Sequence, residues 1–139
     1  MKILIPVDGS PASIRALKLA IDQLPKAGFV IVNVQSPAAL GLGGGGGIMP
    51  LGWIEQQEEK ATRKALQRAV AVCSEAGVTY VTRSERGAIA ETIDRVAREE
   101  HVAQIFMGTR GLGGVRGLVL GSVATQLLHL AEVPVTLVK

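Results

Sequence analysis

Short apolar runs alternate with segments of helical periodicity along this chain of 139 residues, and this alternation limits the possible folds more than any other feature. The apolar runs have the length of buried strands and occupy residues 3–7, 29–34, 78–82, 103–107 and 133–138. Strands that alternate strictly with helices run parallel and are joined by right-handed crossovers. The sequence therefore predicts an α/β fold, a three-layer α/β/α sandwich around a five-stranded parallel sheet.

Local signals predict where several helices begin and end. Ser10 and Pro11 are an N-cap residue and a first-turn proline for the first helix, and Gly77 suits the C-terminal cap of a long second helix. Residues 78–82 mix polar and apolar positions more than the other runs, which predicts a strand at the sheet edge. The apolar stripes of the last two helices comprise Ile89, Ile93, Val96 and Ala97, then Leu120, Val123, Ala124, Leu127 and Leu128.

Composition indicates a single domain over residues 1–139, because 47% hydrophobic residues suffice for one continuous core. A single cysteine excludes an internal disulfide framework, and the chain shows neither a basic-apolar leader nor a long apolar span. We therefore expect a cytoplasmic protein without membrane contact. The 15 Lys and Arg residues are interleaved with 12 acidic residues and aromatic residues are few, so a nucleic-acid partner is not expected.

A glycine-spaced segment follows the fourth apolar run: Gly108, then Gly111 after two residues, then Gly121 and Ser122 after nine more. Glycines let backbone N–H groups approach an anion, and the helix that follows adds unpaired amides and the positive end of its dipole. No Gly-Lys-Ser/Thr sequence follows, which excludes a Walker-type P-loop. The alternative, Ser122 as a simple N-cap, leaves the other glycines of the segment unexplained.

Asp8 follows the first apolar run and is the second polar feature of interest. If the strand order is the common 3-2-1-4-5, the order reverses between the first and fourth strands, and ligands bind beyond the carboxyl ends of the strands there. Asp8 would then bind ribose hydroxyls or position a cation through water, or it is a turn residue that bonds its own loop amides. Arg110 and Arg116 either neutralise phosphate charge or are solvated side chains.

These residues give the chain a resemblance to the universal stress protein family in its small single-domain form. The G-x2-G-x9-G-S/T motif of the family's nucleotide-binding subset is matched at Gly108, Gly111, Gly121 and Ser122. The similarity extends from Ile3–Ser10 to Pro134–Val138. It implies an adenine nucleotide alpha hydrolase-like fold with strand order 3-2-1-4-5 and ATP as the ligand.

The resemblance also implies a role for each site residue. Asp8 would hold the ribose, Pro6 and Met107 would line the adenine pocket, and Val34 would present backbone groups to adenine. Val7 and Arg110 belong to the same binding set. The phosphates would be wrapped by Gly108, Gly111, Gly121, Ser122 and Val123. A Mg²⁺ or Mn²⁺ ion would be held mainly by the phosphates, because no carboxylate cluster stands near the glycine segment.

Three functions follow from this interpretation. The first is an ATP-binding stress or regulatory protein whose nucleotide occupancy changes the surface offered to partners. The second is slow ATP hydrolysis or phosphoryl transfer, although no acid or histidine is evidently placed to orient water, and no catalytic residue is assigned. The third is a nucleotide-free interaction module. A homodimer through the apolar strand Val133–Val138 is expected under all three.

The remaining features carry weaker predictions. The glycine-rich connection over about residues 36–52 departs from the family pattern and is interpreted as a mobile tether. Cys73 falls on the apolar stripe of the second helix, which predicts a buried, inert thiol. His101 and His129 share no metal-ligand spacing, so surface or capping roles are expected.

Overall fold

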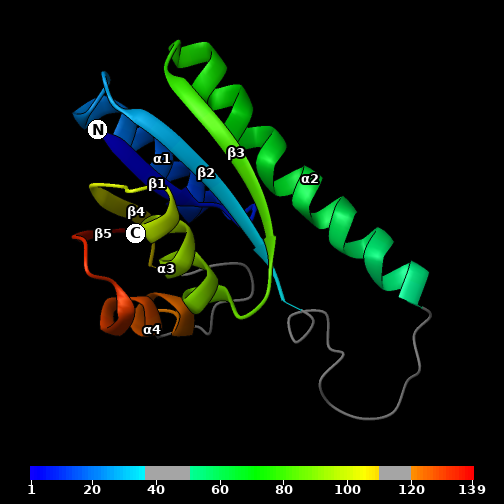
Figure 1. Cartoon of the computed structure of the whole chain (residues 1–139). Helices are drawn as coiled ribbons and strands as arrows, with labels where there is room; N and C mark the ends of the chain where they lie inside the picture. The colour runs from blue at the N-terminus through cyan, green and yellow to red at the C-terminus, as the bar shows by residue number, and fades with distance from the viewer. Residues whose placement is uncertain (37–50, 110–119) are drawn as a thin grey trace.

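A computed structural model describes residues 1–36, 51–109 and 120–139 of the chain (Figure 1). Its elements are β1 (Lys2–Pro6), α1 (Pro11–Gln23), β2 (Gly28–Gln35), α2 (Leu51–Ala76), β3 (Thr79–Arg86), α3 (Ile89–Glu99), β4 (Gln104–Gly108), α4 (Ser122–Leu130) and β5 (Val135–Val138). The predicted tether falls almost wholly outside the described residues, as do Arg110, Gly111 and Arg116.

The strands form one parallel sheet in the order β3-β2-β1-β4-β5, which confirms the predicted fold and strand order. Leu4 in β1 pairs with Val30 of β2 on one side and with Ile105 of β4 on the other. The chain therefore winds outward from β1 in both directions, and the order reverses between β1 and β4.

The core consists of two apolar layers, one on each face of the sheet. Ile3, Ile5 and Phe29 point to the face covered by α1 and α2, where they meet Leu17 and Ala69. On the other face, the alternate strand positions pack against α3 and α4; this layer includes Leu4, Val30, Val32, Ile93, Val96, Ile105 and Leu127. The sheet is thus covered on both faces, as nearly continuous apolar strands require.

The helix ends agree with the local signals in the sequence. The Ser10 hydroxyl oxygen accepts a hydrogen bond from the Ser13 N–H at 3.2 Å, as an N-cap does. After α2, Gly77 has φ of +68°, and the Val78 N–H bonds back to the Cys73 carbonyl at 3.3 Å. His101, with φ of 53°, ends α3 in the same way and is exposed, which agrees with the expected surface or capping role.

Several predicted details differ from the structure. Leu120 precedes α4, whose N-cap is Gly121, and the last strand begins at Val135 and not at Val133, since Pro134 has no N–H to donate to the sheet. β3 lies at the sheet edge as expected, but it extends to Arg86, beyond the predicted end at Thr82. Pairing with β2 and ion pairs with neighbouring helices support this polar half of the strand, and a hydrophobic pattern does not detect such support. In α4, Ala124 and Leu127 are buried as expected, whereas Leu128 is 45% exposed, because the helix turns only a narrow stripe toward the sheet.

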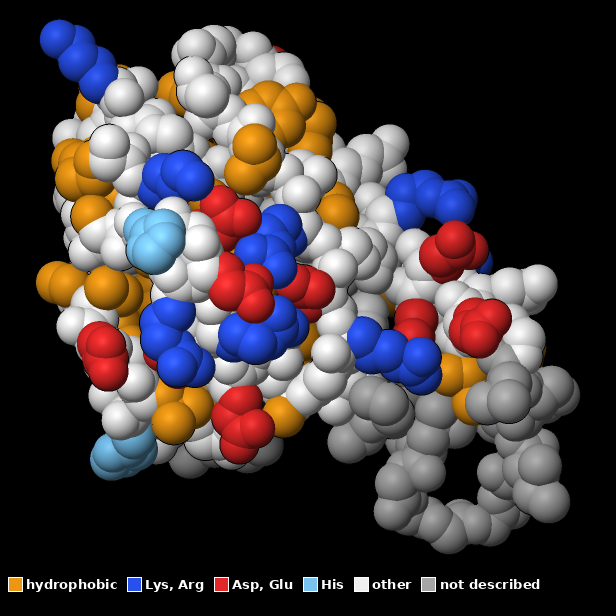
Figure 2. Space-filling model, viewed as in Figure 1, with side chains coloured by type: hydrophobic (Ala, Val, Ile, Leu, Met, Phe, Trp, Pro, Cys, Tyr) orange, Lys and Arg blue, Asp and Glu red, His pale blue; other side chains and the backbone are white. Residues whose placement is uncertain are grey.

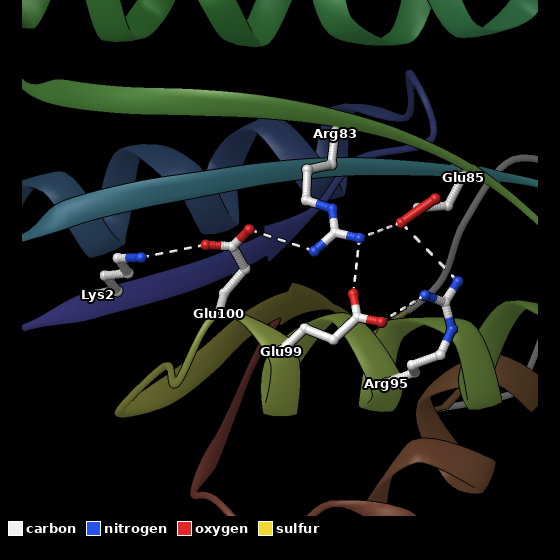
Figure 3. Close-up of polar contacts among 6 residues, drawn as sticks. All are labelled: Lys2, Arg83, Glu85, Arg95, Glu99 and Glu100. Carbon is white, nitrogen blue, oxygen red and sulfur yellow. Dashed lines mark hydrogen bonds and ion pairs between the residues drawn. The ribbon is translucent and has the colours of Figure 1, made fainter.

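An ion-pair network connects the C-terminal part of α3 to strands β1 and β3 (Figure 3). Arg83 of β3 bonds Glu85 on its own strand, Glu99 at 2.8 Å and Glu100 at 3.2 Å. Lys2 of β1 bonds Glu100 at 3.1 Å, and Arg95 of α3 lies 2.8 Å from Glu99 and 3.8 Å from Glu85. The Arg83 guanidinium thus connects three carboxylates, on β3, at the end of α3 and at the residue after it, and it is the central member of the network.

We expect Arg83→Met to lower the melting temperature at neutral pH by roughly 2–4 °C. The melting temperature of the variant should also fall less than that of the wild type when the pH is lowered. Hydrogen bonds from Arg83 and Arg95 lower the pKa of Glu99, and hydrogen bonds from Lys2 and Arg83 lower that of Glu100. A lowered folded-state pKa gives stability that is present above the ordinary value of 4.5 and is lost as the pH falls through the lowered value. Thermal unfolding from pH 7 to pH 3 measures this effect.

Arg98→Met is the matched control for this prediction, since Arg98 also lies on α3 and, among the described residues, pairs with Asp94 of the same helix at 3.1 Å. Its melting curve is expected to keep the acid dependence of the wild type. Equal behaviour of the two variants would show that the network adds nothing beyond ordinary surface pairs.

The surface around this network carries charges of both signs in alternation, with no patch of one sign on the face that Figure 2 shows. None of the helices in the described parts of the chain combines the length and apolar character needed to cross a membrane.

Candidate functional site

The carboxyl ends of β1 and β4 meet the first turn of α1 at the point where the strand order reverses. A Cβ atom added to Gly108, the last residue of β4, would lie 2.8 Å from the Ala12 Cβ and 3.1 Å from the Ala12 carbonyl carbon. The Gly121 N–H donates to the Thr109 carbonyl at 2.6 Å, which brings the start of α4 to the same place. Two segments about one hundred residues apart in the chain therefore converge at one edge of the sheet.

Asp8 stands in the loop between β1 and α1, with an exposed side chain. Its Oδ1 accepts a hydrogen bond from the Ser10 N–H at 2.9 Å, and Gly9 has φ of +87°. The turn role that the sequence left open is therefore present. This turn fixes the carboxylate at the tip of β1, beside the glycine at the end of β4.

The start of α4 supplies the second polar part of the site. Gly121 is the N-cap residue, and Ser122 is the first residue of the helix, exposed to solvent. The alternative in which Ser122 is the N-cap is thus not what the structure has. Gly121 makes no side-chain cap, and its carbonyl accepts from the Thr125 N–H at 3.1 Å and the Thr125 hydroxyl at 3.0 Å. The first amides of α4 have no partner within the helix, and Ser122 is exposed beside them.

Three apolar site residues lie on one face of the sheet. Pro6, Val34 and Met107 each stand two residues beyond a residue of the α3 and α4 core layer: Leu4, Val32 and Ile105. Pro6 and Val34 are partly exposed, while Met107 is only 6% exposed and packs within that layer. These three residues, at the carboxyl ends of the three central strands, are called the apolar shelf below; its accessible surface comes mainly from Pro6 and Val34.

The backbone of Val34 extends past the end of β1. The Val7 N–H donates to the Val32 carbonyl at 2.8 Å, so Val32 turns its polar backbone groups toward β1. Backbone groups alternate along a strand, and Val34 therefore directs its N–H and carbonyl to the same side. The last residue of β1, Pro6, pairs with Val32, so the Val34 groups lie two residues beyond the neighbouring strand.

Sequence reasoning missed two residues that build this site. Ala12 sets the close approach of α1 to Gly108, which no sequence pattern predicts. Asn33 is 2% exposed, and its amide donates to the Val7 carbonyl at 2.8 Å, directly before Asp8. A signal for Asn33 was available, since it is the one polar residue within the apolar run from Phe29 to Val34.

The other candidate residues have structural roles. Cys73 is fully buried in the layer under α2, as predicted, and burial raises the pKa of its thiol to about 11. Within the described ranges, no group of three or more His, Cys, Asp or Glu side chains is arranged to hold a metal ion. Val123 packs against the core layer under α3 and α4, and Val7 belongs to the layer under α1 and α2.

Comparison with known proteins gives the family. The model of the universal stress protein family matches residues 1–139. The universal stress protein YxiE of Bacillus subtilis is 30% identical over 145 residues, covering 99% of this chain and 98% of its own length. A universal stress protein of Thermus aquaticus is 34% identical over 144 residues, covering 99% and 97%.

Solved structures agree with this fold. The hypothetical protein MJ0577 superposes with a TM-score of 0.80 at 24% identity, covering 99% of this chain and 94% of its own. A universal stress protein in complex with cAMP gives 0.69 at 21% identity, covering 100% and 97%. A universal stress protein family protein of Arabidopsis thaliana with AMP bound gives 0.68 at 17% identity, covering 100% and 91%. From the match over its whole length, we conclude that this chain belongs to the universal stress protein family.

Proposed function

We propose that this protein binds ATP at the carboxyl edge of β1 and β4 and acts as a nucleotide-dependent regulatory protein of the stress response. The observation that carries the proposal is the convergence of the Asp8 loop, Gly108 and the start of α4 where the strand order reverses. Parallel α/β sheets bind ligands at this position. Two family members of the same fold have been solved with AMP or cAMP, which supports an adenine nucleotide as the ligand.

The adenine ring is assigned to the apolar shelf of Pro6, Val34 and Met107. A purine base buries apolar surface and needs a few fixed polar groups for orientation. The backbone N–H and carbonyl of Val34, directed beyond the end of β1, are a donor and an acceptor of that kind.

The ribose and the phosphates are assigned to the polar parts of the site. Asp8 is exposed at the tip of β1 and accepts the ribose hydroxyls, while its turn bond with the Ser10 N–H holds its orientation. The phosphates bind Gly108, Gly121, Ser122 and Val123, where the amides and the dipole of α4 favour negative charge. Arg110 and Gly111, which lie outside the described residues, complete the phosphate contacts in this proposal.

A Mg²⁺ or Mn²⁺ ion would accompany the triphosphate and be held mainly by its oxygens. This assignment fits the donor set, because the described residues offer no cluster of carboxylates for a cation. The alternative is that the protein is an enzyme that slowly hydrolyses the bound ATP. Rapid, repeated release of ADP would favour an enzymatic function.

Binding is tested by mass spectrometry of small molecules released from the denatured protein, together with thermal shift assays in Mg-ATP. The proposal predicts recovery of an adenine nucleotide, or a rise of about 4 °C or more in melting temperature at saturating Mg-ATP. Purified protein that carries no nucleotide and shows no thermal shift would contradict it and would favour the nucleotide-free interaction module.

The proposal includes a homodimer formed through residues 133–138. β5 lies at one edge of the sheet, and its four residues are partly exposed. The Pro134 and Val138 carbonyls accept from Ile105 of β4 and from Thr109 directly after it, so the backbone groups of Val135 face away from β4. Val135→Pro removes one outward donor and leaves the β4 pairing in place. Sedimentation velocity is expected to give a dimer for the wild type and a monomer for the variant; a monomeric wild type at micromolar concentration would refute the dimer.

A further inference from the structure

Asn33 has a buried side chain that joins three separate segments at the candidate site. It lies in β2, is 2% exposed and directly precedes Val34. Its Nδ2 donates to the Val7 carbonyl at 2.8 Å, and its Oδ1 accepts from Gln35 Nε2 at 2.7 Å and from the Thr62 hydroxyl of α2 at 3.0 Å. Since a carbonyl can only accept, the contact with Val7 fixes which end of the amide faces β1.

The bond to Val7 controls the direction of the chain at Asp8. The Val7 carbonyl belongs to the peptide group that ends at the Asp8 nitrogen, while the Val7 N–H is held by the Val32 carbonyl at 2.8 Å. Both peptide groups that flank Val7 are thus attached to β2. The direction in which the Asp8 side chain leaves the backbone is therefore set from β2, beyond the last residue of β1.

The other two bonds hold the Asn33 amide itself in place. Gln35 is in turn held at the strand end, since its carbonyl accepts from the Gly87 N–H at 3.0 Å. Thr62 connects the Asn33 amide to α2, at a point of the helix that precedes its buried residues Ala69 and Cys73. A buried polar group held by several hydrogen bonds keeps one orientation, and loss of one partner weakens the hold on that orientation.

We propose that Asn33 is a positioning residue for ribose recognition: its amide holds the Val7–Asp8 peptide in the orientation that lets the Asp8 carboxylate meet the ribose hydroxyls, and Thr62 links this orientation to α2. The inference rests on the proposed binding of ATP. Asn33 does not touch the nucleotide in this account, because its side chain is buried and directed to Val7, Gln35 and Thr62.

The test compares the affinities of ATP and 2′,3′-dideoxyATP, both as magnesium complexes, by calorimetry. Asp8 acts on the ribose hydroxyls, so the wild type should prefer ATP by about tenfold, the effect of one charge-assisted hydrogen bond. Asn33→Asp keeps the size of the side chain and its acceptors but places an acceptor against the Val7 carbonyl. This variant is expected to reduce the preference to about twofold, as Asp8→Asn does.

Two further variants separate positioning from stability. Thr62→Val removes one donor to the Asn33 amide with little change of shape, folds even if Asn33→Asp does not, and should lower the preference to about threefold. Cys73→Ala is the matched control, since it destabilises α2 away from the site and should keep the tenfold preference.

The outcomes distinguish the inference from the proposed function. A wild type that binds neither nucleotide refutes the proposed function. A wild type that prefers ATP, with Asn33→Asp and Thr62→Val keeping the full preference, overturns the positioning role and leaves ATP binding intact. An Asp8→Asn variant that keeps the preference for ATP also overturns the inference, because the ribose hydroxyls would then be recognised by a residue other than Asp8.

Discussion

Replacement of Gly121 by valine is expected to weaken Mg-ATP binding by about 100-fold or more and to leave the fold in place. Gly121 has φ of −75° and ψ of 165°, which a β-branched residue adopts readily, so its backbone does not require glycine. A valine side chain at the N-cap of α4 would occupy the space in front of the amides that are proposed to meet the phosphates. Calorimetric titration of Mg-ATP measures the loss.

Gly28→Val is the control for this substitution. Gly28 lies at the amino end of β2, whereas the candidate site lies at the carboxyl ends of the strands. A Cβ atom added to Gly28 would contact the Met1 carbonyl oxygen at 3.9 Å, which is an ordinary van der Waals distance. This variant should bind Mg-ATP as the wild type does. Wild-type affinity in Gly121→Val would show that the phosphates do not lie at the start of α4, whereas an unfolded variant, seen by circular dichroism, would show that Gly121 has a structural role.

Replacement of Gly108 by alanine is expected to reduce the free energy of unfolding by about 2–3 kcal/mol and to weaken nucleotide binding as well. The new Cβ would lie 2.8 Å from the Ala12 Cβ and 3.2 Å from the Ser13 nitrogen, which are rigid atoms of the first turn of α1. The helix must move to admit it, and the Asp8 loop leads directly into that turn. Urea denaturation measures the stability, and calorimetry measures the affinity.

Substitutions at the two glycines of the motif are thus expected to differ in their effects on stability and affinity. Gly108→Ala should lose both stability and affinity, while Gly121→Val should lose affinity almost alone. A fully stable Gly108→Ala variant would contradict the close packing of β4 on α1, which is the physical reason for glycine at that position.

The fold could be predicted well from the sequence because its strands are long apolar runs. Residues such as Leu4, Val30 and Ile105 must be buried on both faces of a sheet, and the helical stripes between them leave a parallel α/β sandwich as the solution. The polar end of β3 was not predicted, because Arg83 and Arg86 are held there by carboxylates of α3 and α2, which are distant in the sequence. Leu128 illustrates the same limit, since an apolar residue need not be buried.

The candidate site was predictable where it depends on topology and was missed where it depends on contacts. Asp8 and Gly108 each follow a strand, and the strand order is enough to bring them to one edge. The buried amide of Asn33 and the approach of Ala12 to Gly108 depend on how α2 and α1 sit against the sheet. Those distances are set by packing across the whole domain, which periodicity does not encode.

A titration of the ¹⁵N-labelled protein with Mg-ATP, followed by amide chemical shifts, tests nucleotide binding at this edge most directly for a chain of 14.5 kDa. Binding there predicts saturable shifts concentrated at the ends of β1, β2 and β4 and at the start of α4. The amides expected to respond most are those of Asp8, Gly9, Val34, Gly108, Gly121 and Ser122. The absence of shifts at millimolar Mg-ATP, or shifts confined to the charged face of α3 and β3, would contradict it.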